Sequence, residues 1–194
     1  LSIPESQVLT LTGIVGMGTD ELVAQLFEKG QGTKPIYLLI NSPGGSVLSG
    51  AMIISAMESS KVPVYTVCLE ICASMAAMIF EHGTERYVVD RALLMFHPAS
   101  IGGGGPEELD KTVSRLLTLQ RYIGKMENHV ASRAGISFER YKLLSASELW
   151  IDGEDAVNGG FADKLISLPI VSKNKAHRAS SSDSILDRKL SITW

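Results

Sequence analysis

The chain has 194 residues, of which 45% are hydrophobic and 20% are charged, and its formal net charge is −3. This composition is typical of a globular protein and excludes a chain that is disordered throughout. Without a basic excess to neutralise phosphates, nucleic acid is not expected as a partner. No apolar run approaches the roughly 18 residues that cross a bilayer, so we expect no membrane span.

The length fits one domain, which we place at residues 1–172. Residues 173–194 form a polar, serine-containing tail that we expect to dock on a neighbouring chain. We expect a cytoplasmic protein, although the chain begins at Leu1 rather than at methionine, which leaves room for an upstream segment.

Apolar runs and turn residues alternate regularly in the first half of the chain. They predict strands at residues 8–13, 36–40, 62–67, 86–89 and 92–96, and helices from residue 19, at 47–57 and at 73–80. The run at 36–40 is continuously apolar, as in a strand that is buried on both faces. The alternation predicts an α/β fold with a largely parallel sheet.

The second half is predicted to be mainly helical. Four consecutive glycines at residues 102–105 favour a flexible loop, and Pro106 then suits the first position of a long helix that reaches about Ala134. A shorter helix should follow Ser137, and another should begin within residues 152–155 and stop at residues 159–160. We expect the long helix to project from the core or to pack on another subunit.

Two segments could each contribute to a catalytic site. Residues 41–46, Asn-Ser-Pro-Gly-Gly-Ser, follow a buried strand, and their glycines permit close approach of backbone N–H groups to a ligand. Ser74 stands among small residues between a strand and a helix, where the N–H of Met75 is free to face an oxyanion. Alone, the first is also explained as a strand-to-helix turn and the second as a helix N-cap.

His97 ends an apolar strand, and alone it would be read as structural. The weaker candidates are His82, His129 and His177. Because a hydroxyl nucleophile needs a base and its acyl intermediate needs oxyanion donors, Ser74 and His97 with the N–H groups of Gly45 and Met75 would supply most of an acyl-transfer site.

The two cysteines, Cys68 and Cys72, are predicted to be structural thiols. They are too few for a disulfide framework, and no histidine or second cysteine pair stands near them in the sequence. We therefore expect neither a metal nor an organic cofactor.

The motifs at residues 41–47, 73–75 and 95–98 together resemble those of the serine peptidase family of the Clp protease proteolytic subunit, which has the ClpP/crotonase fold. The resemblance extends from about Val8 to Leu168, and the three motifs occur in the family's order. It implies Ser74 as nucleophile and His97 as general base. It also implies Gly45 and Met75 as oxyanion donors, stacked ββα units, and a long helix projecting after the core.

The third catalytic residue is less well defined. Counting back from the predicted helix at residue 153 places Glu148 at the position where the family normally has aspartate. Asp152 is the alternative acid. Ser145 and Glu148 also have the spacing of a helix capping box, which would give Glu148 a purely structural role.

The sequence departs from the family in three further ways. Glu70 stands where the family tends to have glycine, and a carboxylate there could crowd or charge the site. The interval between Ser74 and His97, 23 positions, is slightly shorter than usual. The chain also starts almost at its first strand, whereas family members carry a longer segment that meets an ATPase ring, so docking to a Clp ATPase is in question.

The resemblance implies a serine peptidase that cleaves peptide bonds in peptides or unfolded proteins within a homo-oligomeric ring. Two other interpretations remain open. The chain could be an inactive assembly subunit, in which Glu70 and the uncertain acid spoil the chemistry. It could also be a ClpP-like protease that acts without an ATPase, such as a viral head-maturation protease.

Overall fold

The structure is a computed structural model, and it describes residues 7–16, 18–99 and 109–167. Several predicted features lie outside these ranges: the four glycines at residues 102–105, the helix start at Pro106 and the tail at residues 173–194. The first strand to the last covers most of the predicted domain.

The strands and helices of the first half follow the predicted order, and the second half contains two short strands that the sequence did not predict. The strands are β1 (Val8–Val15), β2 (Ile36–Gly45), β3 (Val64–Ala73), β4 (Arg86–Val89), β5 (Leu93–Phe96), β6 (Leu149–Asp152) and β7 (Lys164–Ile166). The helices are α1 (Thr19–Gly30), α2 (Val47–Glu58), α3 (Met75–Glu81), α4 (Leu109–Arg133), α5 (Phe138–Ser145) and α6 (Gly153–Asn158). The α/β fold class predicted from the sequence is confirmed.

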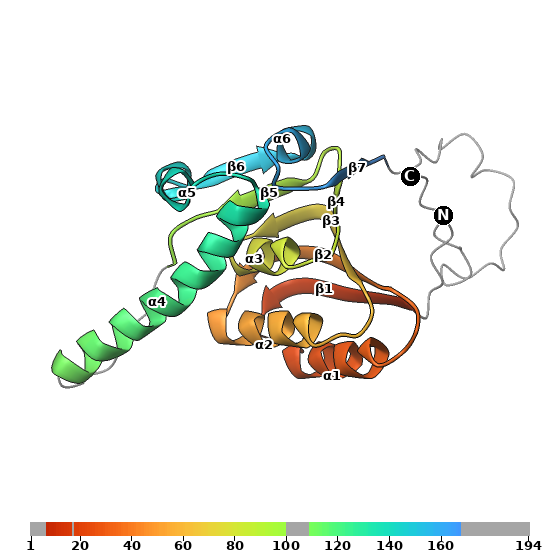
Figure 1. Ribbon diagram of the computed structural model, residues 1–194, viewed down its shortest axis with the longest axis horizontal. Coiled ribbons are helices and arrows are strands. Elements are labelled where there is room, and N and C mark those ends of the chain that lie inside the picture. The colour runs from red at the N-terminus through yellow and green to blue at the C-terminus, as the bar shows by residue number, and fades with distance from the viewer. Residues whose placement is uncertain (1–6, 17, 100–108, 168–194) are drawn as a thin grey trace, which may run out of the picture.

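Within the described residues the strands form one seven-stranded sheet (Figure 1). Its main path runs β1-β2-β3-β4-β7, and every pair along it is parallel. The exit end of β3 pairs with β5, which in turn pairs antiparallel with β6. The predicted, largely parallel sheet is therefore present, and its antiparallel extension brings β6 next to the end of β5.

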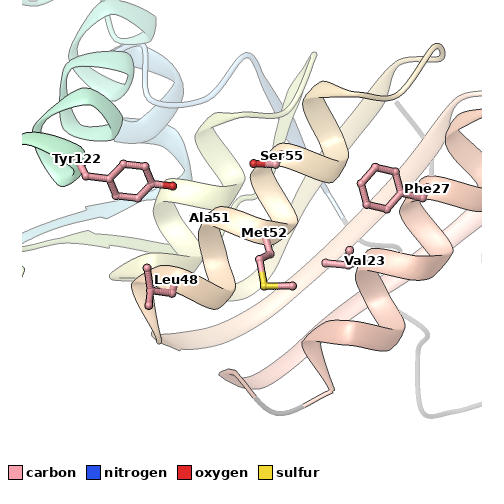
Figure 2. Close-up of a pocket in the computed structure, with 7 residues that line it drawn as sticks. All are labelled: Val23, Phe27, Leu48, Ala51, Met52, Ser55 and Tyr122. Atoms are coloured by element: carbon pink, nitrogen blue, oxygen red, sulfur yellow. The ribbon is translucent and has the colours of Figure 1, made fainter. Parts of the chain in front are cut away.

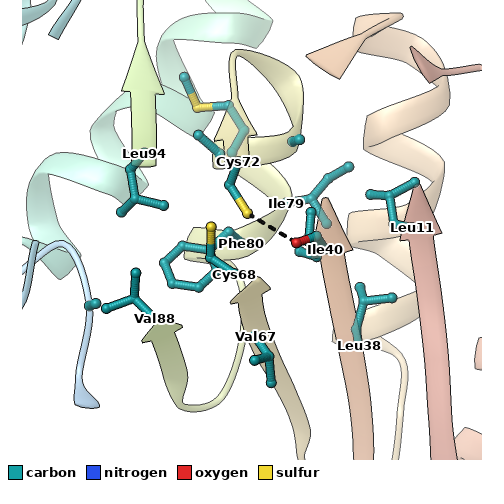
Figure 3. Packing of buried hydrophobic residues seen from close by; sticks show 14 of the residues in the cluster. Leu11, Leu38, Ile40, Val67, Cys68, Cys72, Ile79, Phe80, Val88 and Leu94 are labelled. Carbon is teal, nitrogen blue, oxygen red and sulfur yellow. Dashed lines mark hydrogen bonds between the residues drawn. The ribbon is translucent and has the colours of Figure 1, made fainter. Parts of the chain in front are cut away.

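The core lies around β2 and β3. Residues Ile36–Ile40 are all buried, as their unbroken apolar run predicts. Cys68 and Cys72 lie on β3 within this core, both are free thiols, and the Cys72 Sγ lies 3.9 Å from the carbonyl oxygen of Ile40 (Figure 3). The prediction that the cysteines are structural is confirmed.

Two predicted strand ends were wrong: β3, predicted to end at residue 67, continues to Ala73, and β2 also runs past its predicted end. The sequence Asn41–Gly45 was expected to break the strand, yet β2 continues through it to Gly45. Hydrogen bonds to both neighbouring strands hold the extension. The Ser42 hydroxyl donates to the Gly13 carbonyl at 2.5 Å, and the Asn41 Oδ1 accepts from the Ile71 N–H at 3.3 Å. Proline and glycine are tolerated because the register shifts at this point instead of the strand ending.

The helices of the second half follow the predictions closely. Helix α4 spans 25 residues and extends away from the sheet (Figure 1), which confirms the predicted projecting helix. The Ser137 hydroxyl caps α5 by accepting from the Arg140 N–H, and the Asp152 carboxylate caps α6 by accepting from the Asp155 N–H.

A buried ion-pair network fixes the C-terminal end of α3. The Arg86 guanidinium contacts Glu81 Oε2 at 2.5 Å and Asp163 Oδ1 at 2.7 Å, and the Arg133 guanidinium reaches Asp163 Oδ2 at 3.2 Å. Burial raises the pKa of Glu81 to about 8, while the Arg86 charge opposes that rise. The network ties α3 to β4 and to the segment before β7.

Candidate active site

Ser74 occupies a strained turn between β3 and α3. Its backbone has φ 55° and ψ −124°, a conformation that costs a non-glycine residue about 1–3 kcal/mol. The turn is held from both sides: the Ser74 N–H donates to the Met95 carbonyl at 2.8 Å, and the Ser74 carbonyl accepts from the N–H groups of Ala77 and Met78. Such a turn presents the side chain at the end of the sheet.

The Ser74 hydroxyl is directed to a histidine and does not cap the helix. It makes no capping hydrogen bond to α3, and its Oγ lies 2.8 Å from the Nε2 of His97. The parallel pairing of β3 with β5 sets this distance, because Ala73 lies opposite Met95, Ser74 follows Ala73 directly, and His97 follows Met95 by two residues. Interpreting Ser74 as a structural N-cap was therefore wrong.

Gly44 lies against the serine turn, whereas Gly45 faces Ile14 and Val15 of β1. A Cβ on Gly44 would come within 2.6 Å of the Ala73 carbonyl oxygen, 2.7 Å of the Ser74 Cβ and 2.9 Å of the Met75 nitrogen. The Gly44–Gly45 peptide therefore lies beside the first residue of α3. As the first residue of α3, Met75 has no carbonyl partner within its own helix.

Glu148 lies next to His97 in the backbone but its carboxylate contacts another residue. The β5–β6 pairing ends with Phe96 opposite Leu149, so His97 and Glu148 each lie one residue beyond the last pair. The Glu148 Oε2 accepts a hydrogen bond from the Trp150 indole N–H at 3.1 Å. Among the described residues, His97 forms no other hydrogen bond or ion pair than that with Ser74.

The alternatives for Glu148 are not supported. Asp152 pairs with Leu93 at the far end of β5, about 13 Å along the strand from His97, and its carboxylate is occupied in capping α6. The capping-box interpretation was also wrong, because Ser145 ends a helix and Glu148 leads into strand β6. Glu148 itself has φ 69°, a turn conformation.

Glu70, the residue that could crowd or charge the site, is not buried. It is exposed on β3, four residues before the nucleophile candidate.

A shallow pocket of about 400 Å³ lies elsewhere, between α1, α2 and α4 (Figure 2). Its lining is mainly apolar and includes Phe27, Met52 and Tyr122, and none of the predicted site residues belongs to it.

Two residues of the site were missed by sequence reasoning. Gly44 was passed over in favour of Gly45, although it is Gly44 that lies within contact distance of the serine turn. The consecutive glycines were a signal for both. Trp150 was missed because a tryptophan two residues after a glutamate, on a short strand, is not a motif; only the β6 alternation hints that the two share a face.

A strained serine at a strand-to-helix turn, with its hydroxyl bonded to an imidazole, is the arrangement of serine-type hydrolases. The family model for Clp protease matches residues 4–168. The chain is similar to ATP-dependent Clp protease proteolytic subunit 2 of Prochlorococcus marinus subsp. pastoris, with 31% identity over 77% of this chain and 76% of that protein. It is also similar to the ATP-dependent Clp protease proteolytic subunit of Streptococcus pyogenes, with 30% identity over 84% of this chain and 85% of that protein.

The chain belongs to the Clp protease family. It has the ClpP-type α/β fold and is a serine peptidase, so the family, fold and enzyme class predicted from the motifs are confirmed. Within the part of the chain that the structure describes, none of the helices combines the length and the hydrophobicity of a membrane span.

Proposed function

We propose that Ser74 is the nucleophile and His97 the general base of this peptidase. The observation that supports this most strongly is the 2.8 Å separation of the Ser74 Oγ and the His97 Nε2 at a strained turn. The hydroxyl oxygen attacks the scissile carbonyl carbon while its proton passes to Nε2. The imidazolium then gives this proton to the leaving amine, and water hydrolyses the acyl-enzyme by the same route.

The N–H groups of Gly45 and Met75 are proposed to bind the oxyanion. The close fit of Gly44 against Ser74 supports this, because it holds the Gly44–Gly45 peptide beside the first turn of α3. A donor of this kind contributes about 3 kcal/mol to transition-state stabilisation. Any side chain on Gly44 would displace the turn.

Glu148 is proposed as the acid that orients His97. For Nε2 to accept the serine proton, the neutral imidazole must carry its own proton on Nδ1, and a carboxylate facing Nδ1 holds that tautomer and stabilises the imidazolium. The backbone register supports Glu148, and the position and capping role of Asp152 argue against the alternative.

The substrates are proposed to be peptides or unfolded proteins, cleaved inside a homo-oligomeric ring. Large apolar side chains support self-association: Leu48 is 65% exposed, Met52 48% and Leu117 of the projecting helix 54%. The names of the relatives include ATP dependence, and a Clp ATPase is proposed as partner on that ground alone. Light scattering after size-exclusion chromatography tests the ring, since a stable monomer at micromolar concentration contradicts it.

A cytoplasmic location is proposed as well. The free thiols of Cys68 and Cys72 suit a reducing compartment, in which disulfides are rare. Fractionation of the source cells with antibody detection tests this. No observation favours an inactive assembly subunit or a head-maturation role over this account.

Labelling with a fluorophosphonate probe tests the proposed catalytic pair directly. Wild-type protein should be labelled and should hydrolyse a fluorogenic peptide, whereas Ser74→Ala should lose both. Ser46→Ala is the matched control, because this serine only caps α2 and should leave labelling intact. Equal labelling of the wild type and Ser74→Ala contradicts the proposal.

A further inference from the structure

The contact between Glu148 and Trp150 bears on how the proposed catalytic acid is used. The Trp150 indole N–H and the Glu148 carboxylate are 3.1 Å apart, and both residues are exposed. A carboxylate engaged in this way is not available to another donor in the same direction. The residue that the backbone register puts beside it, His97, has only its Nε2 side occupied within the described chain.

The three side chains belong to one ribbon. Residues directly opposite in an antiparallel pair have Cα atoms about 4.5–5.5 Å apart and share a face, as do residues two apart on one strand. Trp150 pairs with Met95, and the ladder ends with Phe96 opposite Leu149, one residue before His97 and one residue after Glu148. His97 and Glu148 therefore both lie one residue beyond the last pair at the same end of the ribbon, and rotation about the side-chain bonds of Glu148 changes the direction of its carboxylate.

We propose that the Glu148 carboxylate alternates between the Trp150 indole and the His97 Nδ1, and that Trp150 is a positioning residue which limits the fraction of molecules with a complete Ser-His-acid triad. This inference rests on the proposed roles of Ser74, His97 and Glu148. The state in the structure is the Trp150-bound one. In this state Ser74 and His97 are hydrogen-bonded to each other, while the Glu148 carboxylate is hydrogen-bonded to Trp150.

Competition between Trp150 and His97 for the Glu148 carboxylate predicts the direction in which a substitution of Trp150 changes the rate. Trp150→Phe keeps an aromatic ring but removes the N–H donor, so Glu148 is released to His97. The kcat/KM for a fluorogenic peptide should rise by about 5-fold, the factor that corresponds to loss of one hydrogen bond of about 1 kcal/mol. Because a facing carboxylate favours the imidazolium, the acid limb of the kcat/KM profile should also move to higher pH.

A double-mutant cycle separates this role from a merely structural one. In a Glu148→Gln background, Trp150→Phe should leave both the rate and the pH profile unchanged. Glu148→Asp is a second route: the side chain is one methylene shorter and loses reach to the indole, so a further Trp150→Phe change should have little effect. Thermal unfolding of each variant checks the fold, and half-exposed Trp150 should tolerate phenylalanine.

The outcomes are distinct. A lower rate in Trp150→Phe, or the same rate change with and without Glu148, overturns the competition while fluorophosphonate labelling of Ser74 stays intact. Absence of labelling in the wild type overturns the catalytic assignment and this inference with it. A rate increase that requires Glu148, together with the shifted acid limb, supports both.

Discussion

The two halves of the proposed triad are built in different ways. Ser74 and His97 follow adjacent parallel strands whose residues are largely buried, and their contact is already made. Glu148 lies on an exposed turn before a four-residue antiparallel strand, and its carboxylate is bonded to Trp150. The difference teaches that the sheet core determines the nucleophile–base pair, whereas the acid depends on a surface side chain that has a choice of partners.

The largest expected effect on activity comes from removing one member of the hydrogen-bonded pair Ser74 and His97. His97→Ala removes the base, so kcat for peptide hydrolysis should fall by about 10⁴-fold or more. His177→Ala is the matched control, since this histidine is outside the proposed site in the sequence. Steady-state hydrolysis of a fluorogenic peptide measures both. Retention of more than a tenth of the activity in His97→Ala contradicts the assigned base.

The fit of Gly44 against the serine turn is tested next. Gly44→Ala forces a Cβ to within 2.6–2.9 Å of three atoms of the turn, at a residue with φ 93°. Because even a 1 Å displacement of a catalytic group costs about 100-fold, kcat/KM should fall by about that factor.

Gly135→Ala is the control for the Gly44 substitution. Gly135 also has a positive φ, 69°, but no atom lies within 4 Å of a Cβ built there. It should lose about 1 kcal/mol of stability and no activity. Equal activity losses in the two variants would show that backbone strain alone, and not contact with Ser74, accounts for the effect.

The helix that follows Ser74, α3, is held at its C-terminal end by the buried side chain of His82. The His82 ring stacks on His129 with centroids 3.9 Å apart, and its Nδ1 lies 2.8 Å from the Met78 carbonyl. Burial lowers the pKa of His82 to about 4, helped by the charges of His129 and Arg133, while Glu58 Oε1 is 3.9 Å away. The neutral ring therefore stabilises the fold above pH 6.5, and this contribution is lost as the pH falls from 6.5 to about 4.

The size of this loss is at most about 3 kcal/mol, the free energy of a shift from the ordinary histidine pKa to about 4. Glu81, whose pKa is raised, works in the opposite direction: its contribution is lost as the pH rises from 4.5 to about 8. The His82 effect must therefore be measured as the difference in denaturant-unfolding free energy between wild type and His82→Gln. A difference that does not change between pH 7 and pH 4 contradicts the assignment.

A smaller effect on activity is expected from the acid. Glu148→Gln should lower kcat by about 10- to 100-fold, less than His97→Ala, because the carboxylate orients the base and does not itself exchange the substrate proton. Asp152→Asn is the control, since that residue caps α6 and lies at the other end of the ribbon. If the activity loss follows Asp152 and not Glu148, the acid has been assigned to the wrong residue.

The sequence and the structure agree where the signal is local and buried. The apolar run before Asn41 predicted the first half of β2, and the small residues around Ser74 led to the proposed catalytic pair. The continuation of β2 was not predictable, because this strand persists through Asn41–Gly45 only by hydrogen-bonding to strands that are distant in the sequence. The hydrogen-bond partner of Glu148 was not predictable either. The rotamer of an exposed side chain determines which neighbour it contacts, and no residue pattern specifies that rotamer.

Stacking of His82 on His129 is a further case. Each was a weak catalytic candidate from its surroundings in the sequence, and only the packing of α4 against α3 joins them. Neither contacts Ser74 or His97 in the described chain. Their role is thus in holding α3, which begins directly after Ser74, the proposed nucleophile.

The most direct measurement is a crystal structure of the protein with a peptide boronate, which mimics the tetrahedral intermediate. Our account predicts a bond from boron to the Ser74 Oγ and one boronate oxygen about 2.7–3.1 Å from the N–H groups of both Gly45 and Met75. Boron attached to another side chain, or a boronate oxygen directed away from both amides, contradicts it.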